Sequence, residues 1–229
     1  MDNEAGRAPT VRLIGAGRLA RRLAHLMVDD AQLERLWIAD PSSLDTALYP
    51  TMGSGASNAE GLRHRLAGSP VDVRVVSHWS KPDGAAPGLT VIATPTSEPD
   101  RWIAQYLFEL GDPYLVVRAD HDRASIGPLV LPGRSPCLHC SDMIMAMQRP
   151  HLWQHLVTAC QRIARPSALM IDLAAGIAAA QVHAFLAGRP SNVIGNTLDV
   201  SVGDWTLRLQ ELRTHPLCPW CGTPGIFAA

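Results

Sequence analysis

Two cysteine pairs, far apart in the chain, constrain the fold more than any other feature of the sequence. Each pair has two residues between its cysteines and lies in a loop rich in proline or glycine: Cys137 with Cys140, and Cys218 with Cys221. Such pairs can present four thiolates tetrahedrally to one ion, and zinc is the metal that prefers these ligands. The spacing therefore predicts a structural four-cysteine zinc clamp that ties the end of the chain to the main domain across 77 intervening residues.

Redox chemistry is the alternative for a pair of this kind, because the first cysteine then lies at the N-terminus of a helix and becomes a thiolate. Only eight residues follow Cys221, and they include Pro224 and Gly225, which do not suit a helix. We therefore interpret the four cysteines as zinc ligands. With all four positions filled, the ion would have no open site for a catalytic water.

Charge and composition exclude several classes of protein. Hydrophobic residues make up 47% of the 229 residues and charged ones 18%, which indicates a compact globular chain. The formal net charge of -1 gives no support to a nucleic-acid or membrane-surface partner. The single lysine, Lys81, is followed by Pro82, so a P-loop is excluded. The first ten residues are polar and lack the features of a secretory signal, so we expect a cytoplasmic, thiol-reducing setting.

The first half of the chain alternates short apolar runs with helical patterns. The runs, which we expect to be strands, are residues 10–14, 36–39, 71–76, 89–93 and 114–117. Alternation of this kind is typical of parallel βαβ units. It predicts a Rossmann-like, doubly wound α/β half over residues 10–123.

From residue 124 to residue 229 the pattern changes, and we expect antiparallel strands, a helical crossover and the zinc knuckles as a continuation of the same domain. Two helical stretches follow the first cysteine pair. The second, residues 168–186, is apolar enough to raise the question of a membrane span, but Asp172, Gln181 and His183 interrupt it, so we expect a buried or subunit-facing helix. Residues 197–202 and 205–212 then alternate in polarity and predict an antiparallel hairpin.

A glycine turn joins the first predicted strand to the following helix. Gly15 and Gly17 allow a tight turn and the close approach of a phosphate, and the helix N-terminus directs N–H groups at the anion. Asp40, at the end of the second predicted strand, stands where a carboxylate accepts ribose hydroxyls. These residues predict an adenine-nucleotide site, although a turn of this kind also occurs as a plain strand-to-helix connection.

Two longer segments carry a resemblance to a known family: Ala124-Ser-Ile-Gly-Pro-Leu-Val-Leu-Pro-Gly-Arg-Ser-Pro-Cys-Leu-His-Cys140 and His215-Pro-Leu-Cys-Pro-Trp-Cys-Gly222. With the glycine turn and Asp40, they resemble the ThiF/MoeB family, which is similar in fold to ubiquitin-activating enzymes. Within it, the chain is most similar to the ThiF-like partners of azoline-forming peptide cyclodehydratases. The resemblance spans residues 11–222. It implies ATP- and magnesium-dependent adenylation of the C-terminal carboxylate of a peptide or small carrier protein, usually by a homodimer.

The chain departs from this family where the reaction needs charge. The resemblance implies an arginine after the second strand, a basic residue at the start of the next helix and a magnesium-binding aspartate after the fourth strand. The loop over residues 41–55 contains no arginine or lysine, Asn58 begins the helix, and Pro95 stands where the aspartate is expected.

Three residues are candidates for a catalytic role. Arg18 in the glycine turn and Lys81 near a strand end could replace the missing cations. Cys160 lies on the predicted crossover, where some relatives carry a thiol that forms a covalent intermediate, although a lone cysteine among apolar residues is also an ordinary core residue.

We therefore expect a ThiF-like zinc protein that binds a peptide or carrier-protein tail as a non-catalytic partner in peptide or carrier maturation. An active ATP-dependent adenylyltransferase is the main alternative. A nicotinamide-dependent oxidoreductase would share the glycine turn and Asp40, but it would give no account of the cysteine pairs. An assembly scaffold would need no nucleotide at all.

Overall fold

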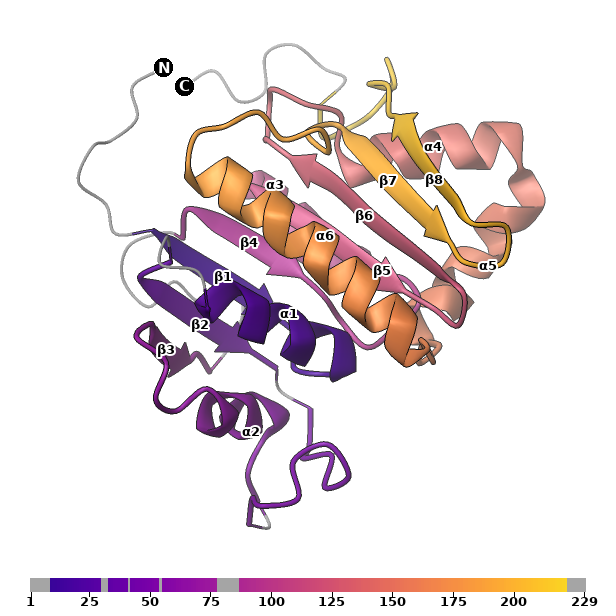
Figure 1. The fold of residues 1–229 in the computed structure, drawn as a ribbon. Helices are drawn as coiled ribbons and strands as arrows, with labels where there is room; N and C mark the ends of the chain where they lie inside the picture. Colours follow the sequence, from indigo (N-terminus) through magenta and orange to yellow (C-terminus); the bar gives the residue numbers. More distant parts are fainter. Residues whose placement is uncertain (1–8, 30–32, 41, 54, 78–86, 222–229) are drawn as a thin grey trace.

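The structure is a computed structural model that describes residues 9–29, 33–40, 42–53, 55–77 and 87–221 (Figure 1). Eight strands form one sheet in the order β3-β2-β1-β4-β5-β6-β7-β8. The strands are β1 (Thr10–Ile14), β2 (Arg35–Ala39), β3 (Asp72–Val75), β4 (Leu89–Ile92), β5 (Tyr114–Ala119), β6 (Arg123–Val130), β7 (Asn196–Ser201) and β8 (Thr206–Glu211). The predicted α/β fold, a doubly wound half extended by antiparallel strands, is confirmed.

The pairing of the strands divides the sheet into two parts. Strands β1 to β5 run parallel to one another, and β6, β7 and β8 continue the sheet antiparallel from β5. The central strands β1 and β4 are buried along their whole length, as expected of strands covered on both faces. The strand order reverses between β1 and β4, which is the place where open α/β sheets bind their ligands.

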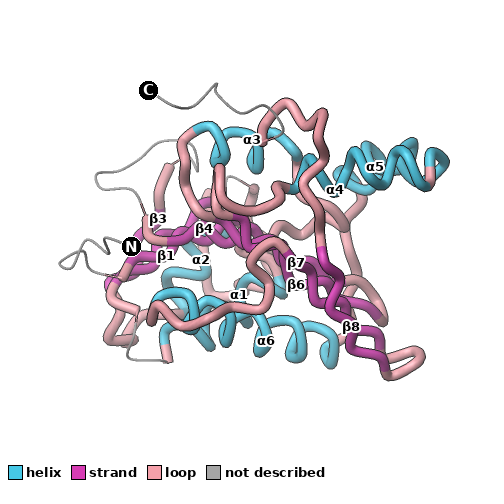
Figure 2. Tube along the Cα trace, turned by 90° about the horizontal axis from the view of Figure 1, so that it is seen from above, coloured by secondary structure: helices cyan, strands magenta, loops and turns pink. Residues whose placement is uncertain are grey.

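Helices cover both faces of the sheet (Figure 2). One face carries α1 (Arg18–Val28), α2 (Asn58–Arg65) and α6 (Ala168–Leu186), and the other carries α3 (Arg101–Glu109) and α4 (Leu138–Gln148). Helix α5 (Pro150–Gln161) extends away from the body.

The sequence predicts one helical stretch between the first cysteine pair and residue 168, whereas the structure has two, α4 and α5. Arg149 leaves the helical conformation (φ −142°, ψ 71°) ahead of Pro150, because the proline ring disfavours a helical residue before it.

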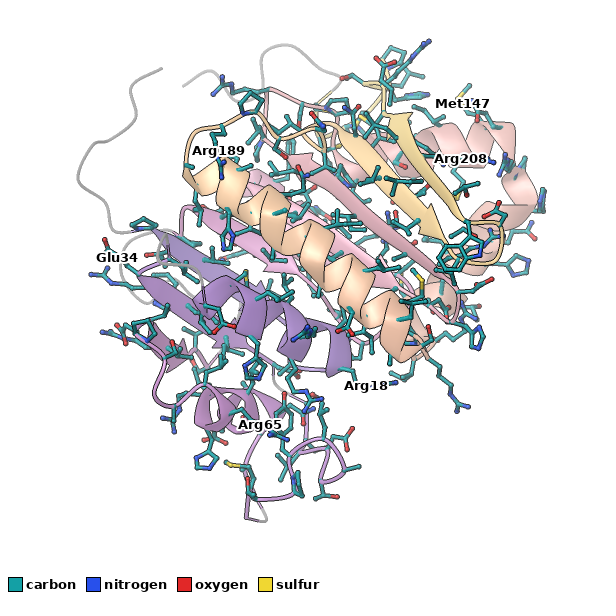
Figure 3. All side chains as sticks on the ribbon, in the orientation of Figure 1. Arg18, Glu34, Arg65, Met147, Arg189 and Arg208 are labelled. Carbon is teal, nitrogen blue, oxygen red and sulfur yellow. The ribbon has the colours of Figure 1, made fainter. Side chains whose placement is uncertain are left out.

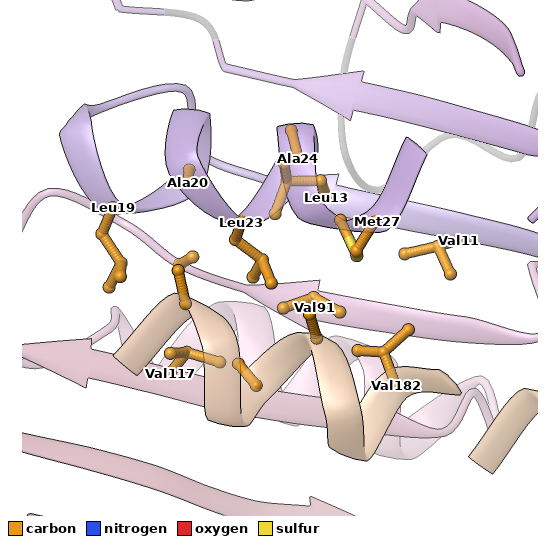
Figure 4. Close-up of a cluster of buried hydrophobic side chains, with 14 of the residues drawn as sticks. Val11, Leu13, Leu19, Ala20, Leu23, Ala24, Met27, Val91, Val117 and Val182 are labelled. Atoms are coloured by element: carbon orange, nitrogen blue, oxygen red, sulfur yellow. The ribbon is translucent and has the colours of Figure 1, made fainter. Parts of the chain in front are cut away.

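The larger core lies beneath α1 and α6. Leu23 and Met27 of α1 meet Val182 of α6 over Val91 of β4 (Figure 4). Small side chains on the buried face of α6, including Ala178, let the two helices approach closely, so their apolar faces exclude water together.

Helix α6 is long and apolar enough, by length and composition, to cross a membrane. In the structure it lies lengthwise on α1 and on the sheet, as Figure 1 shows. Its polar residue Asp172 accepts a hydrogen bond from Arg22 of α1 at 2.8 Å. The helix that the sequence predicts to be buried or subunit-facing is therefore present, with one face buried against α1 and the sheet and the other exposed.

Strands β7 and β8 form the predicted antiparallel hairpin. Trp205 has φ +53° and belongs to the turn, so the second strand begins one residue later than the alternation of polarity suggests. Within β8, Leu207 and Leu209 pair with apolar residues of β7 on the α6 side, while Arg208 points to the opposite face. The two faces of this hairpin thus differ in chemistry.

Candidate functional site: a cysteine cluster, a glycine turn and a polar groove

The two cysteine pairs meet on the face of the sheet that carries α3. Cys137 immediately precedes α4, Cys140 lies in its first turn, and Cys218 and Cys221 follow β8. The four sulfur atoms lie within 4.8 Å of one another. The Sγ atom of Cys137 is 3.7 Å from that of Cys140 and 3.6 Å from those of Cys218 and Cys221, and the Sγ atoms of Cys140 and Cys221 are 3.1 Å apart.

This arrangement fits a single metal ion. Sulfur atoms at zinc–sulfur bond length around a tetrahedral ion lie about 3.8 Å apart, close to the distances in the cluster. Three of the four cysteines are buried, and the backbone N–H of His215 donates to Sγ of Cys140 at 3.3 Å, a contact that suits a thiolate ligand. The four cysteines can therefore hold a metal ion, as their spacing predicts.

The protonation of the cluster gives the same indication. The hydrogen bond from Cys137 lowers the pKa of Cys140 to about 4, and the same bond raises the pKa of Cys137. Burial raises the pKa of Cys221 to about 12. A divalent cation beside Cys137, Cys140 and Cys221 would favour their thiolate forms, which are the forms that bind metal.

A ring contact joins the two knuckles independently of any ion. His139, inside the first pair, stacks on Trp220, inside the second, with ring centroids 4.8 Å apart and planes 25° apart. The ring of Phe108 in α3 lies beside Trp220, with ring centroids 5.9 Å apart. Sequence reasoning missed this stack, although each of the two residues directly precedes the second cysteine of its pair.

The glycine turn is built around a conformation that only glycine adopts easily. Gly15 has φ +112°, and a Cβ atom there would lie 2.4 Å from the carbonyl oxygen of Ala93. Gly17 precedes α1 in an extended conformation, and a Cβ atom at this position would approach the ring of Pro95 at 3.4 Å. An apolar ring therefore faces the turn at the position where the family resemblance implies an aspartate.

Asp40 lies beside the turn, as predicted, and its carboxylate is largely occupied. One oxygen accepts the N–H of Ala16 at 2.6 Å, and the other accepts the N–H and the hydroxyl of Ser42. The Tyr49 hydroxyl donates to the Ala16 carbonyl at 2.6 Å. A carboxylate offers about four acceptor positions, so roughly one remains for a ribose hydroxyl. The nucleotide roles of Gly15, Gly17 and Asp40 stay a prediction.

The three candidate catalytic residues lie in different settings. Arg18 is exposed and donates to the carbonyl of Pro166 at 3.1 Å. The Cys160 thiol, in α5, donates to the carbonyl of Pro99 at 3.3 Å, and burial raises its pKa. Lys81 lies outside the described residues. The position of Asn58 is also clear: its side chain accepts the N–H of Asp45 at 2.7 Å and thereby holds the loop before α2.

A polar groove of about 490 Å³ lies on the face of β5 to β8 opposite α6. It extends from the loop after β4 to the edge strand β8, and α4 contributes Ser141 and Met145 to its wall. Figure 3 labels Arg208, which lines the groove from β8. Its charged lining residues are Glu98, Arg118, Asp120, Arg123, Asp199, Asp204 and Arg208.

Ion pairs organise one side of the groove. The two carboxylate oxygens of Glu98 accept from Arg118 at 2.8 and 2.9 Å, and one of them also accepts from Arg101 at 3.1 Å. Burial opposes ionisation, but Arg118 and Arg101 together hold the pKa of Glu98 below its usual value. Sequence reasoning missed the groove. The available signal was the alternation of polar residues in the hairpin, which places Thr206, Arg208 and Gln210 on one face.

The sequence matches no protein-family model and no curated protein. Solved structures are similar in fold. A crystal structure of E. coli MccB with succinimide has a TM-score of 0.74 at 16% identity, over 94% of this chain and 66% of that one. The Microcin C7 biosynthetic enzyme MccB in complex with N-formylated MccA has a TM-score of 0.73 at 16% identity, over 93% and 67%. PaaA has a TM-score of 0.66 at 18% identity, over 89% and 73%.

The chain thus spans 66% of the length of that first MccB chain. At these identities the likeness shows the fold, and it confirms the ThiF-like fold that the sequence resemblance implies.

Proposed function

We propose that this chain binds the tail of a peptide or small carrier protein in the groove on β5 to β8. The observation that carries the proposal is the groove itself: about 490 Å³, within the usual range of ligand sites, and lined by charges of both signs. Such a lining suits the amide groups of an extended backbone and a terminal carboxylate. The MccB structures with MccA bound support a peptide as the occupant.

The role that we propose in peptide or carrier maturation is non-catalytic. Pro95 lies against the glycine turn, and Asn58 holds its own loop rather than presenting a cation. Attack of a carboxylate on the α-phosphate of ATP needs cations and a magnesium-binding carboxylate in fixed positions. Neither Pro95 nor Asn58 supplies such a group. We further propose that the metal is zinc and that the chain works in a cytoplasmic, thiol-reducing setting, where its cysteines stay available as ligands.

Selection from an immobilised library of random heptapeptides with free C-termini tests peptide binding. We expect recurrent peptides whose affinity falls at least about tenfold in Arg208→Glu, because the reversed charge lines the groove. Arg189→Glu, in the loop just beyond the C-terminal end of α6, is the matched control and should bind as the wild type does (Figure 3). The absence of recurrent peptides, or equal binding by both variants, would contradict the proposal.

An active adenylyltransferase is the second candidate, favoured by the geometry of Gly15 and by the crystal structure of MccB with ATP. Pyrophosphate exchange into ATP, measured in the presence of the selected peptides, separates the two candidates. The non-catalytic role predicts no exchange above the level without peptide. Exchange that depends on the peptide carboxylate would instead establish the enzyme.

We also propose that the chain forms a homodimer. Leu207 and Leu209, on the α6 side of β8, are 63% and 54% exposed, and Leu169 at the start of α6 is 48% exposed. A double substitution Leu207→Glu with Leu209→Glu should convert the dimer to a monomer in sedimentation velocity, whereas Leu110→Glu, after α3, should not. A wild-type monomer at micromolar concentration would refute the dimer.

A further inference from the structure

A chain of ion pairs connects the helix of the cysteine cluster to the groove. Asp142 lies in α4, two residues after Cys140, and its side chain is 2% exposed. Both of its oxygens accept hydrogen bonds from Arg101, from Nε at 2.7 Å and from Nη2 at 2.9 Å. The same guanidinium donates to Glu98 at 3.1 Å. One arginine of α3 therefore links α4 to the loop after β4.

The connection continues across the antiparallel strands. Glu98 binds Arg118 of β5, and Arg118 donates to the Ser125 hydroxyl of β6 at 3.0 Å. Ser125 in turn donates to the carboxylate of Asp199 in β7 at 2.8 Å. From Glu98 onward, each of these residues lines the groove. This series of ion pairs and hydrogen bonds thus begins beside the cysteine cluster and ends under the groove.

We propose that Arg101 is a positioning residue through which a metal ion at the cysteine cluster sets the shape of the groove. The ion fixes Cys137 and Cys140, and these fix the first turn of α4 and with it Asp142. Arg101 transmits that position to Glu98 and Arg118. The inference rests on metal binding at the cluster and on the groove of the proposed function, whatever ligand the groove takes.

Burial makes this connection stiff. The side chains of Arg101, Glu98 and Arg118 are 19%, 22% and 18% exposed, so water screens their charges only in part. If α4 moved away with Asp142, Arg101 would lose both hydrogen bonds to that carboxylate, and a nearly buried Asp142 would remain unpaired. The side chains that these contacts connect therefore move together rather than one at a time. Loss of the ion would loosen the groove as well as the knuckles.

Hydrogen–deuterium exchange of zinc-loaded and chelator-treated protein, without any peptide, tests the coupling. In the wild type, chelation should speed exchange at least about fivefold in residues 114–130 and 196–201 as well as in 137–148, while residues 18–28 keep their protection. In Arg101→Gln, segments 114–130 and 196–201 should exchange fast with zinc bound, and chelation should add no further change. Arg22→Gln, which breaks the Arg22–Asp172 pair on the opposite face, is the control and should behave as the wild type does.

Two results would overturn the inference: a chelation effect confined to residues 137–148, or one that reaches residues 18–28 equally, which would be general loosening.

Zinc affinity provides a second measurement if Arg101→Gln does not fold. Because coupling is reciprocal, Glu98→Gln should weaken zinc binding about fivefold in competition with a chromophoric chelator, and Arg22→Gln should not. Equal zinc affinities would also refute the coupling. Neither experiment uses a peptide. A failure of the coupling is therefore distinct from a failure of peptide binding.

Discussion

At the scale of single residues, the glycine turn owes its shape to one position. Gly15 has φ +112°, and a Cβ atom at this position would lie only 2.4 Å from the carbonyl oxygen of Ala93. Gly17, two residues later, has an ordinary extended conformation and more room. The sequence predicts the same role for both glycines. The backbone geometry distinguishes them: a side chain at residue 15 would be strained, and one at residue 17 would not.

Gly15→Ala should therefore lower the free energy of unfolding by about 2 kcal/mol or more, the range of left-handed strain combined with a clash. Gly17→Ala, the matched control, should cost less than about 1 kcal/mol, since its Cβ atom would make a contact at 3.4 Å. Urea denaturation followed by circular dichroism measures both changes. Equal costs would contradict the strain at Gly15.

A pH effect follows from Glu98. Arg118 and Arg101 hold its pKa in the folded chain below the unfolded value, so its ionised form stabilises the fold. That contribution is fully present above the unfolded pKa of about 4.3 and is lost as the pH falls through the lower folded value. The stability difference between wild type and Glu98→Gln should thus shrink from about pH 5 towards pH 3 in urea denaturation. A constant difference would mean that the ion pairs do not stabilise the fold.

At the scale of elements, periodicity predicted what local sequence controls. The strands β1, β2 and β4, helix α1 and the terminal hairpin follow from apolar runs and from spacing. The break between α4 and α5 was missed because it depends on the conformation of one residue, Arg149, before Pro150. The groove was missed because its walls come from α4 and from four strands, and no local pattern records which faces meet.

The contact between α1 and α6 makes a prediction at this scale. Ala178 is fully buried in the core that the two helices share, so Ala178→Leu would force them apart. The free energy of unfolding should fall by about 1–3 kcal/mol. Ala180→Leu, on the exposed face of the same helix, should change it by less than about 0.5 kcal/mol. If both variants unfold at the same urea concentration, α6 does not pack as described.

At the scale of the whole molecule, the cysteine cluster joins the two ends of the second half of the chain. The first pair lies at the start of α4 and the second follows β8. One ion bound by both pairs would therefore close a long loop of the chain, and it would also hold α4, which forms a wall of the groove. The clustering of the four cysteines was predictable because the geometry of a metal site restricts the spacing of its ligands in the sequence. The ion pairs and hydrogen bonds beside them, from Asp142 to Asp199, were not, because they join five elements that only the fold brings together.

The metal content of the purified chain tests this account most directly. Native mass spectrometry with elemental analysis should find one zinc ion per chain, and Cys218→Ser combined with Cys221→Ser should abolish it, whereas Cys160→Ser should leave it unchanged. A wild-type chain prepared under reducing conditions that is free of metal and does not take up added zinc would contradict the account.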